Sequence, residues 1–242
     1  MKTMILIYGL GGSGTRLYID ILRIYGIYVG NNLNESLDDL NTFFYSDYYD
    51  QINNKLSFDD YNNFKQIFYS QLNSSGYLDK DIFCIKEPNF HILIHLVIKF
   101  CKEYNINLIT IHTIRDFKYM INSLNKNQSE RWKYLFSNKY NDKYKKTRFQ
   151  SIEYWYYANR RAINFVKENN IKHLILSYEN LINHPEIEIN KIFKLINKNF
   201  DISKYDDFVS KISNKSRSKE EKIEYIPNDL IVMADKINKK IN

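Results

Sequence analysis

The sequence predicts an α/β protein in three layers, in which helices cover both faces of a central parallel β-sheet. Short apolar runs recur along the chain, and stretches that favour helix separate them. The first apolar run, at 4–8, leads through the glycine-rich letters "GLGGSG" directly into a predicted helix. Strands that alternate with helices build a parallel sheet, because each crossover helix returns the chain to the same edge.

Short continuous apolar runs are typical of strands that are buried on both faces. The predicted strands are 4–8, 27–29, 82–86, 108–112 and 173–179. Helices are predicted at 14–25, 36–44, 58–72, 91–104, from about 116, at 152–169 and 186–197, and in the basic C-terminal part. Residues 127–148 are highly charged and show no clear periodicity.

Composition limits the class of protein. The chain has 242 residues, of which 44% are hydrophobic and 16% aromatic, so it has enough apolar side chains for a packed core. Nothing in the middle is typical of a linker, and we expect one domain over residues 1–242. Two cysteines are too few for a disulfide framework, which favours reduced thiols and a cytoplasmic protein.

Neither a targeting segment nor a membrane span is expected. The N-terminal "MKTMILIYGL" has too short an apolar run for a signal peptide and is better explained as the first strand. No run reaches the ~18 apolar residues of a transmembrane helix. The net charge of +7 suits nucleic acid, an anionic membrane or a small polyanionic ligand, and charge alone does not choose among them. A nucleic-acid-binding module has no support beyond this charge.

The loop in "YGLGGSGTR" has the composition of an anion-binding turn. Glycines let a ligand approach the backbone closely, and the N-terminus of the following helix adds partial positive charge. A tight strand–helix connection that needs small residues is the alternative explanation. Thr15 stands where the nucleoside-triphosphate loop has lysine, and Arg16 where it has the magnesium-binding hydroxyl, so a kinase or ATPase is disfavoured. The dinucleotide motif also fits poorly, because no acidic residue ends the next strand.

A second candidate phosphate contact lies in "TIRDFKYMINS", after the strand at 108–112. Arg115 at the strand end can hold a phosphate with two parallel hydrogen bonds. Ser123, eight residues further on, can reach the same anion from the helix. Ordinary helix-surface residues are the alternative, but ligands of open parallel sheets bind beyond the carboxyl ends of the strands, which favours a binding role.

Three segments together resemble sulfotransferases that use 3′-phosphoadenylyl sulfate (PAPS). They are "GGSGTR" after the first strand, "IRDFKYMINS" after a middle strand, and "LSYENLINHPEIEINKIFKLI" near the end. They occur in the family's order and cover the chain from about residue 5 to residue 197. The stretch "EYWYYANRRA" also resembles the Trp-x-x-x-Asn helix of bacterial members, through Trp155 and Asn159.

The resemblance implies a metal-independent enzyme with a P-loop-like phosphosulfate-binding loop. It implies that this loop binds the 5′-phosphosulfate, that Arg115 and Ser123 bind the 3′-phosphate, and that a late basic loop with Arg217 covers it. The residues implied to contact the nucleotide are Gly11, Gly12, Ser13, Gly14, Thr15, Arg16, Arg115, Ser123, Tyr178 and Arg217. One departure is Gly12, where the family usually has a Lys or Arg that assists the leaving phosphate. Its absence either weakens catalysis or shifts this role to Arg16 or Lys86.

Sulfuryl transfer requires a base for the acceptor hydroxyl and cations for the bridging oxygen. The stretch "CIKEPNFH" supplies Lys86 as a sulfuryl or phosphate contact and Glu87 as the base, and bacterial sulfotransferases similarly show Lys-acid-Pro here. A strand-end ion pair is the alternative for these two residues. His91 is a second candidate base, whereas His112, inside an apolar strand, is expected to be a core histidine. The catalytic candidates are therefore Glu87, Lys86 and Arg16.

Other functions stay open beside a PAPS-dependent sulfotransferase. A P-loop nucleotide or sugar kinase is one alternative, and a catalytically silent nucleotide-binding member of the sulfotransferase fold is another, motivated by Gly12. For a sulfotransferase, the partners are a small-molecule nucleotide donor and an acceptor that we expect to be a glycan or lipid. The resemblance implies that the segments at about 33–78 and 127–150 form the acceptor site. The oligomeric state is open.

Overall fold

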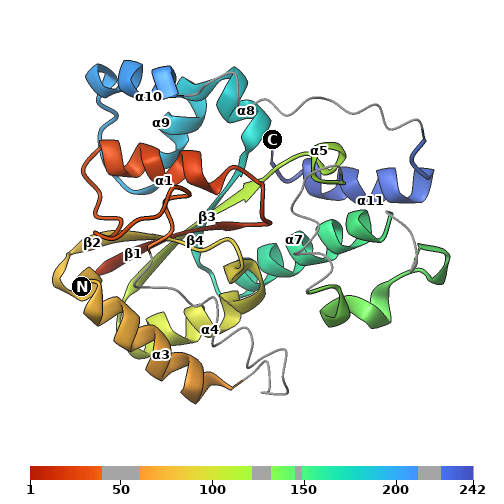
Figure 1. Cartoon of the computed structure of the whole chain (residues 1–242), viewed down its shortest axis with the longest axis horizontal. Coiled ribbons are helices and arrows are strands. Elements are labelled where there is room, and N and C mark those ends of the chain that lie inside the picture. The colour runs from red at the N-terminus through yellow and green to blue at the C-terminus, as the bar shows by residue number, and fades with distance from the viewer. Residues whose placement is uncertain (40–59, 122–131, 145–148, 212–224, 242) are drawn as a thin grey trace.

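Four parallel strands form the central sheet within the part of the chain that the structure describes. This structure is a computed structural model, and it describes residues 1–39, 60–121, 132–144, 149–211 and 225–241. The strand order is β2-β1-β3-β4, from β1 (Thr3–Gly9), β2 (Ile82–Lys86), β3 (Asn107–Ile114) and β4 (Lys172–Ser177). Figure 1 shows helices on both sides of the sheet, so the predicted three-layer α/β fold is confirmed.

The central position of β1 explains its apolar sequence. Ile5 pairs with Cys84 of β2 on one side and with Ile109 of β3 on the other. From Met4 to Gly9 the strand is buried, because both of its edges are paired and helices cover both of its faces. A strand in this position reads as a continuous apolar run instead of an alternating one.

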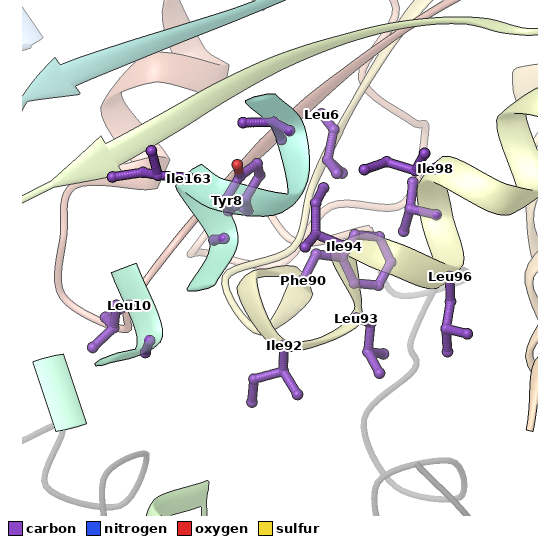
Figure 2. Close-up of a cluster of buried hydrophobic side chains, with 14 of the residues drawn as sticks. Leu6, Tyr8, Leu10, Phe90, Ile92, Leu93, Ile94, Leu96, Ile98 and Ile163 are labelled. Atoms are coloured by element: carbon purple, nitrogen blue, oxygen red, sulfur yellow. The ribbon is translucent and has the colours of Figure 1, made fainter. Parts of the chain in front are cut away.

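Alternate residues of the strands divide the core between two faces. Ile5, Ile7 and Cys84 pack with α1 (Thr15–Ile24) and α9 (Pro185–Leu195). Leu6, Tyr8, Phe83 and Ile85 pack with α3 (Tyr61–Ser74), α4 (Phe90–Glu103) and α7 (Gln150–Glu168). Figure 2 shows part of this second cluster, in which Leu6 lies near Ile94 of α4 and Tyr8 lies toward α7, which carries Ile163.

The remaining described helices are short or peripheral. Those at the carboxyl ends of strands are α5 (Phe117–Ile121) after β3 and α8 (Tyr178–Asn183) after β4. Toward the C-terminus lie α10 (Tyr205–Lys211) and α11 (Asn228–Asn238), and α11 packs against α7. Short 3-10 helices occur at Tyr77–Asp79, Lys133–Lys139, Asp142–Tyr144 and Ile202–Lys204. None of the helices that the structure describes is both long and apolar enough to cross a membrane.

Three predicted elements differ from those in the structure. The segment 27–29 contributes an isolated bridge between Tyr28 and Phe83 instead of a strand, and Gly30, with a φ of 102°, follows it immediately. Residues 36–39 of the predicted helix at 36–44 form a turn and a bridge from Leu33 to Asp39, and the rest lies outside the described residues. The last strand ends at Ser177 because its hydroxyl accepts a hydrogen bond from the Asn180 N–H and caps α8.

Candidate functional site

The loop at 10–14 joins β1 to α1 at the carboxyl edge of the sheet. Gly12 and Gly14 have φ angles of 87° and 88°, in the left-handed region that favours glycine. A Cβ atom on Gly14 would clash with the ring of Tyr178, so that ring packs directly on the loop. Among the described residues no side chain caps α1, which leaves its N-terminus suited to an anion.

Hydrogen bonds tie this loop to the end of β3. The Ser13 and Thr113 hydroxyl oxygens lie 2.8 Å apart, and the Thr113 hydroxyl also donates to the Tyr8 carbonyl at 3.3 Å. All three residues are buried. Gly9 is required between them, because a Cβ there would clash with the Thr113 backbone carbonyl. The loop is therefore fixed on β3 through buried groups.

Arg115 lies between this loop and the start of α8. Its Nη1 donates to the Gly12 carbonyl at 3.1 Å. Its guanidinium carbon is 4.5 Å from the centre of the Tyr178 ring, and its Nε is 4.0 Å from the Glu179 Oε1. Stacking on an aromatic face fixes the plane of a guanidinium, so this cation is oriented toward the glycine loop.

Glu179 links the end of β3 to the end of β4. Its Oε1 accepts from the Asp116 backbone N–H at 3.2 Å, and its Oε2 accepts from the Ser177 hydroxyl at 3.0 Å. Burial raises the pKa of Glu179, and these hydrogen bonds partly oppose that shift. The carboxylate thus helps to hold the backbone beside Arg115.

The Trp-x-x-x-Asn segment of α7 supports the same strand end from the other face. The Trp155 indole N–H donates to the Arg115 carbonyl at 3.0 Å, and the Asn159 side chain donates to the Trp155 carbonyl at 2.8 Å. The Asn159 amide oxygen lies 2.9 Å from the His112 Nε2. Burial lowers the pKa of His112 to about 3, so the ring is neutral near pH 7. The prediction of a hydrogen-bonded core histidine is confirmed.

A second group of charges surrounds Lys86 at the end of β2. The Lys86 Nζ lies 2.5 Å from the Asp38 Oδ1 and donates to the Ser36 carbonyl at 2.6 Å. The exposed Arg16 reaches the same turn through its Nη1, 3.5 Å from the Glu35 carbonyl. The turn at 34–38 therefore joins the first turn of α1 to the end of β2.

Glu87 and His91 lie toward α4 and α7. The Glu87 Oε1 accepts from the backbone N–H of Asn89 at 2.9 Å and from its side-chain amide at 3.1 Å. The two ring nitrogens of His91 lie 2.8 Å from the Pro88 carbonyl and 2.9 Å from the Tyr154 hydroxyl. Burial lowers the pKa of His91 to about 4. Both side chains have local partners that explain their positions.

The structure brings some of the predicted site residues together. The glycine loop, Arg115 and Tyr178 lie in contact, and Lys86 and Arg16 share the turn at 34–38. Ser123 and Arg217 lie outside the described residues. Sequence reasoning missed Thr113 and Asp38, whose partners are far away in the chain and leave no periodic signal. No group of three or more His, Cys, Asp or Glu side chains is arranged to hold a metal ion within the described ranges.

Comparisons with known proteins identify the fold. No protein-family model matches the chain, and no curated protein matches it. The structure is similar to the sulfotransferase domain from the curacin biosynthetic pathway, with 13% identity, a TM-score of 0.57 and 98% of each chain covered. The sulfotransferase domain from the Synechococcus PCC 7002 olefin synthase shows 14% identity and a TM-score of 0.57, over 98% of this chain and 94% of that one.

A third similar structure is sulfotransferase STF9 from Mycobacterium avium. It is 8% identical with a TM-score of 0.54, and the match covers 99% of this chain and 76% of that chain. At these identities the likeness concerns the fold. The chain has the sulfotransferase fold, as the resemblance in its sequence implied.

Proposed function

We propose that the protein is a PAPS-dependent sulfotransferase, which moves a sulfuryl group to an acceptor hydroxyl by in-line displacement. One observation carries the proposal: the Arg115 guanidinium lies against an uncapped glycine loop at the carboxyl edge of a sheet with the sulfotransferase fold. Two anion-binding elements that are distant in sequence therefore meet at one place. A donor with separate 5′ and 3′ phosphate groups requires two such elements.

The residues present fit the nucleotide donor. The N–H groups of the loop and of the first α1 turn would hold the 5′-phosphosulfate, with Gly11, Gly12, Ser13, Gly14, Thr15 and Arg16 in this stretch. Arg115 would hold the 3′-phosphate with Ser123 and Arg217, and Tyr178 would keep the guanidinium plane in place. When bound, PAPS supplies an activated sulfuryl group on a phosphate leaving group. No step in this assignment requires a metal ion.

In this proposal, Lys86 and Arg16 replace the cation that is missing at Gly12. Lys86 lies two residues after Cys84, on the face of β2 that packs against α1, and Arg16 belongs to the first turn of that helix. Both side chains reach carbonyls of the turn at 34–38. These two cations would stabilise the negative charge that develops on the bridging oxygen.

We infer that the acceptor is a glycan or lipid hydroxyl and that the enzyme works in the cytoplasm. The cytoplasmic location rests on the two cysteines and on the lack of an apolar run of membrane-spanning length, and the hydroxyl acceptor follows from the proposed sulfuryl transfer. A panel of hydroxyl acceptors incubated with ³⁵S-labelled PAPS would identify the class.

The decisive experiment is equilibrium binding of adenosine 3′,5′-bisphosphate in buffer with EDTA, measured by calorimetry. The wild-type protein should bind, and Arg115→Ala should weaken binding at least about tenfold, because charge-assisted hydrogen bonds are worth roughly 1.5–3 kcal/mol. Arg23→Ala is the matched control, since it removes one exposed arginine that pairs with Asp20 on α1. Equal losses in both variants would contradict the proposed site.

Two other results would favour the alternative functions. Binding of ATP with magnesium, but not of the bisphosphate, would indicate a P-loop kinase. Bisphosphate binding without sulfate transfer to any acceptor would favour a catalytically silent nucleotide-binding protein, for which Gly12 is the motivation. Labelled PAPS separates this last possibility from an active enzyme.

A further inference from the structure

The carboxylates of Asp38 and Glu87 both lie near the end of β2, but on opposite faces of the sheet. Successive side chains of a strand point to opposite faces. Cys84 packs in the cluster with α1, so Lys86, two residues later, lies on the same face of the sheet as α1. Ile85 packs in the cluster with α4 and α7, so Glu87, two residues after it, lies on that opposite face. Lys86 and Glu87 are therefore poorly placed to act on the same group.

The contacts of Glu87 agree with this division. Its Oε1 accepts two hydrogen bonds from Asn89, whose amide oxygen in turn accepts from the Trp132 indole at 3.3 Å. These contacts hold the connection between β2 and α4. They give Glu87 a structural function on the face away from α1.

Asp38 is the carboxylate that faces the cations. Its Oδ1 lies 2.5 Å from the Lys86 Nζ, and the Lys86 side chain is 3% exposed whereas that of Asp38 is 16% exposed. The lysine is thus enclosed, and the Asp38 side chain is slightly more exposed, although its Oδ1 is buried. An acceptor hydroxyl would therefore approach the Oδ2 side of the carboxylate.

The turn that carries Asp38 is held in a defined shape. The Asn34 Oδ1 accepts from the N–H groups of Ser36 and Asp38 at 2.8 and 3.0 Å, and its amide lies 3.3 Å from the Asp38 Oδ2. Leu37 has a φ of 59°, which few non-glycine residues adopt. Strained residues of this kind cluster at functional sites. The turn also receives Arg16 and Lys86 on neighbouring carbonyls, so it lies between the two cations of the proposed reaction centre.

We infer that Asp38, and not Glu87, is the base of the reaction centre. This inference rests on the proposed function and assigns a residue within that site. The acceptor hydroxyl gives its proton to the Asp38 carboxylate while its oxygen forms a bond to sulfur. The bond from sulfur to the bridging oxygen breaks, and its electron pair leaves with the 5′-phosphate beside Lys86 and Arg16. The products are a sulfate ester, adenosine 3′,5′-bisphosphate and a protonated Asp38 that returns its proton to water.

This placement predicts a selective effect on nucleotide binding that can be measured without knowing the acceptor. Asp38→Asn keeps the shape of the side chain and removes a negative charge beside the 5′-phosphate. The variant should bind adenosine 3′,5′-bisphosphate about fivefold or more tightly than the wild type does. Adenosine 3′-monophosphate, which has no 5′-phosphate, should bind both proteins equally.

Two matched variants complete the experiment. Glu87→Gln should leave both affinities unchanged, and Glu103→Gln controls for net charge, because Glu103 pairs with Lys65 at the far end of α4. With ³⁵S-labelled PAPS and a panel of alcohols, phenols and water, Asp38→Asn should lower turnover about 100-fold or more, as expected for loss of a general base. Glu87→Gln should stay within about twofold of the wild type.

The outcomes separate this inference from the proposed function. If the wild type binds the bisphosphate and Asp38→Asn binds it equally well, the placement of Asp38 is wrong. Loss of turnover in Glu87→Gln, with normal turnover in Asp38→Asn, would return the role of base to Glu87. A wild-type protein that binds no bisphosphate would contradict the proposed function itself.

Discussion

The two ends of the candidate site are held by different kinds of interaction. The β3 corner, which comprises loop 10–14, Thr113, Arg115 and Tyr178, rests on close packing, on hydrogen bonds of buried hydroxyl groups and on the contacts of the Arg115 guanidinium. The β2 corner, which comprises Lys86 and the turn at 34–38, is joined across its two segments by an ion pair and a carbonyl contact. A buried hydrogen-bond network is costly to open, and a buried ion pair is costly to break when one partner is removed. The comparison teaches that packing and hydroxyl groups hold the loop beside β3, whereas a pair of opposite charges holds the turn at 34–38 beside β2.

Gly14→Ala should have the largest effect, because it breaks the β3 corner at its tightest contact. The new methyl group would clash with the Tyr178 ring, and the residue would keep a φ of 88°. We expect a loss of about 3 kcal/mol in the free energy of unfolding, from backbone strain and overpacking together. Urea denaturation measures this loss. Bisphosphate binding should weaken as well, since Tyr178 orients Arg115.

Gly26→Ala is the matched control for this change. Gly26 has a φ of 81°, but a Cβ atom there would meet nothing within 4 Å. Gly26→Ala should therefore lower the free energy of unfolding by the cost of the positive φ alone, about 1 kcal/mol, and leave the bisphosphate affinity unchanged. Equal losses at both glycines would mean that the Tyr178 contact adds nothing, and the description of a tightly packed corner would fail.

Acidic pH should sharpen the comparison, because one buried histidine lies behind each corner. The pKa values of His112 and His91 are lowered by burial from 6.5 to about 3 and about 4. The unfolded chain therefore takes up protons first as the pH falls below 6.5, and stability is lost down to about pH 4. In that window each histidine lowers the free energy of unfolding by up to about 1.4 kcal/mol for each unit by which the pH falls. The raised pKa of Glu179 acts in the opposite direction and offsets a part of the loss.

Stability curves of His91→Gln and the wild type between pH 4.5 and 7.5 check this prediction. The variant should lose about half of the slope, because glutamine does not titrate. The remaining slope belongs to His112 under the β3 corner. An unchanged slope would show that His91 titrates normally in the folded protein.

The double variant Lys86→Met with Asp38→Asn should have the smallest global effect and a clear local one. Replacing both members of a buried ion pair by uncharged side chains of similar size is often nearly neutral, because no unpaired charge remains, so we expect a change within about 1 kcal/mol. The turn at 34–38 loses its ion pair and its carbonyl contact, and its amide hydrogens should exchange about tenfold faster. Hydrogen-exchange mass spectrometry measures this locally. A global loss of several kcal/mol would instead make Lys86 part of the rigid scaffold.

The sheet was predictable because its strands are continuous apolar runs. The predicted range 82–86 coincides with β2, and 4–8 and 108–112 lie within β1 and β3. The segment 27–29 is equally apolar but forms one bridge, because strand formation depends on a partner with room to pair and not on local composition alone. The start of α8 carried a usable signal, since Ser177 is a favoured N-cap residue.

The site was predictable only where one segment carries the chemistry. The glycine loop and Arg115 each follow a strand, and parallel topology brings such segments to one edge. The pairing of Asp38 with Lys86 joins residues that are 48 positions apart in the sequence (86 − 38), across a turn that was expected to be helical. Contacts of this kind depend on the folded path of the chain. The assignments of Ser123 and Arg217 stay predictions.

The two tryptophans of the chain lie beside the ends of two different strands. The Trp155 indole donates to the Arg115 carbonyl, whereas the Trp132 indole donates to Asn89, directly after β2. Both rings are buried, so their emission depends on these local contacts more than on solvent. The protein thus contains one tryptophan beside the end of β3 and one beside the connection from β2 to α4. Replacing either ring with phenylalanine would leave tryptophan emission from the other place alone, without any attached dye.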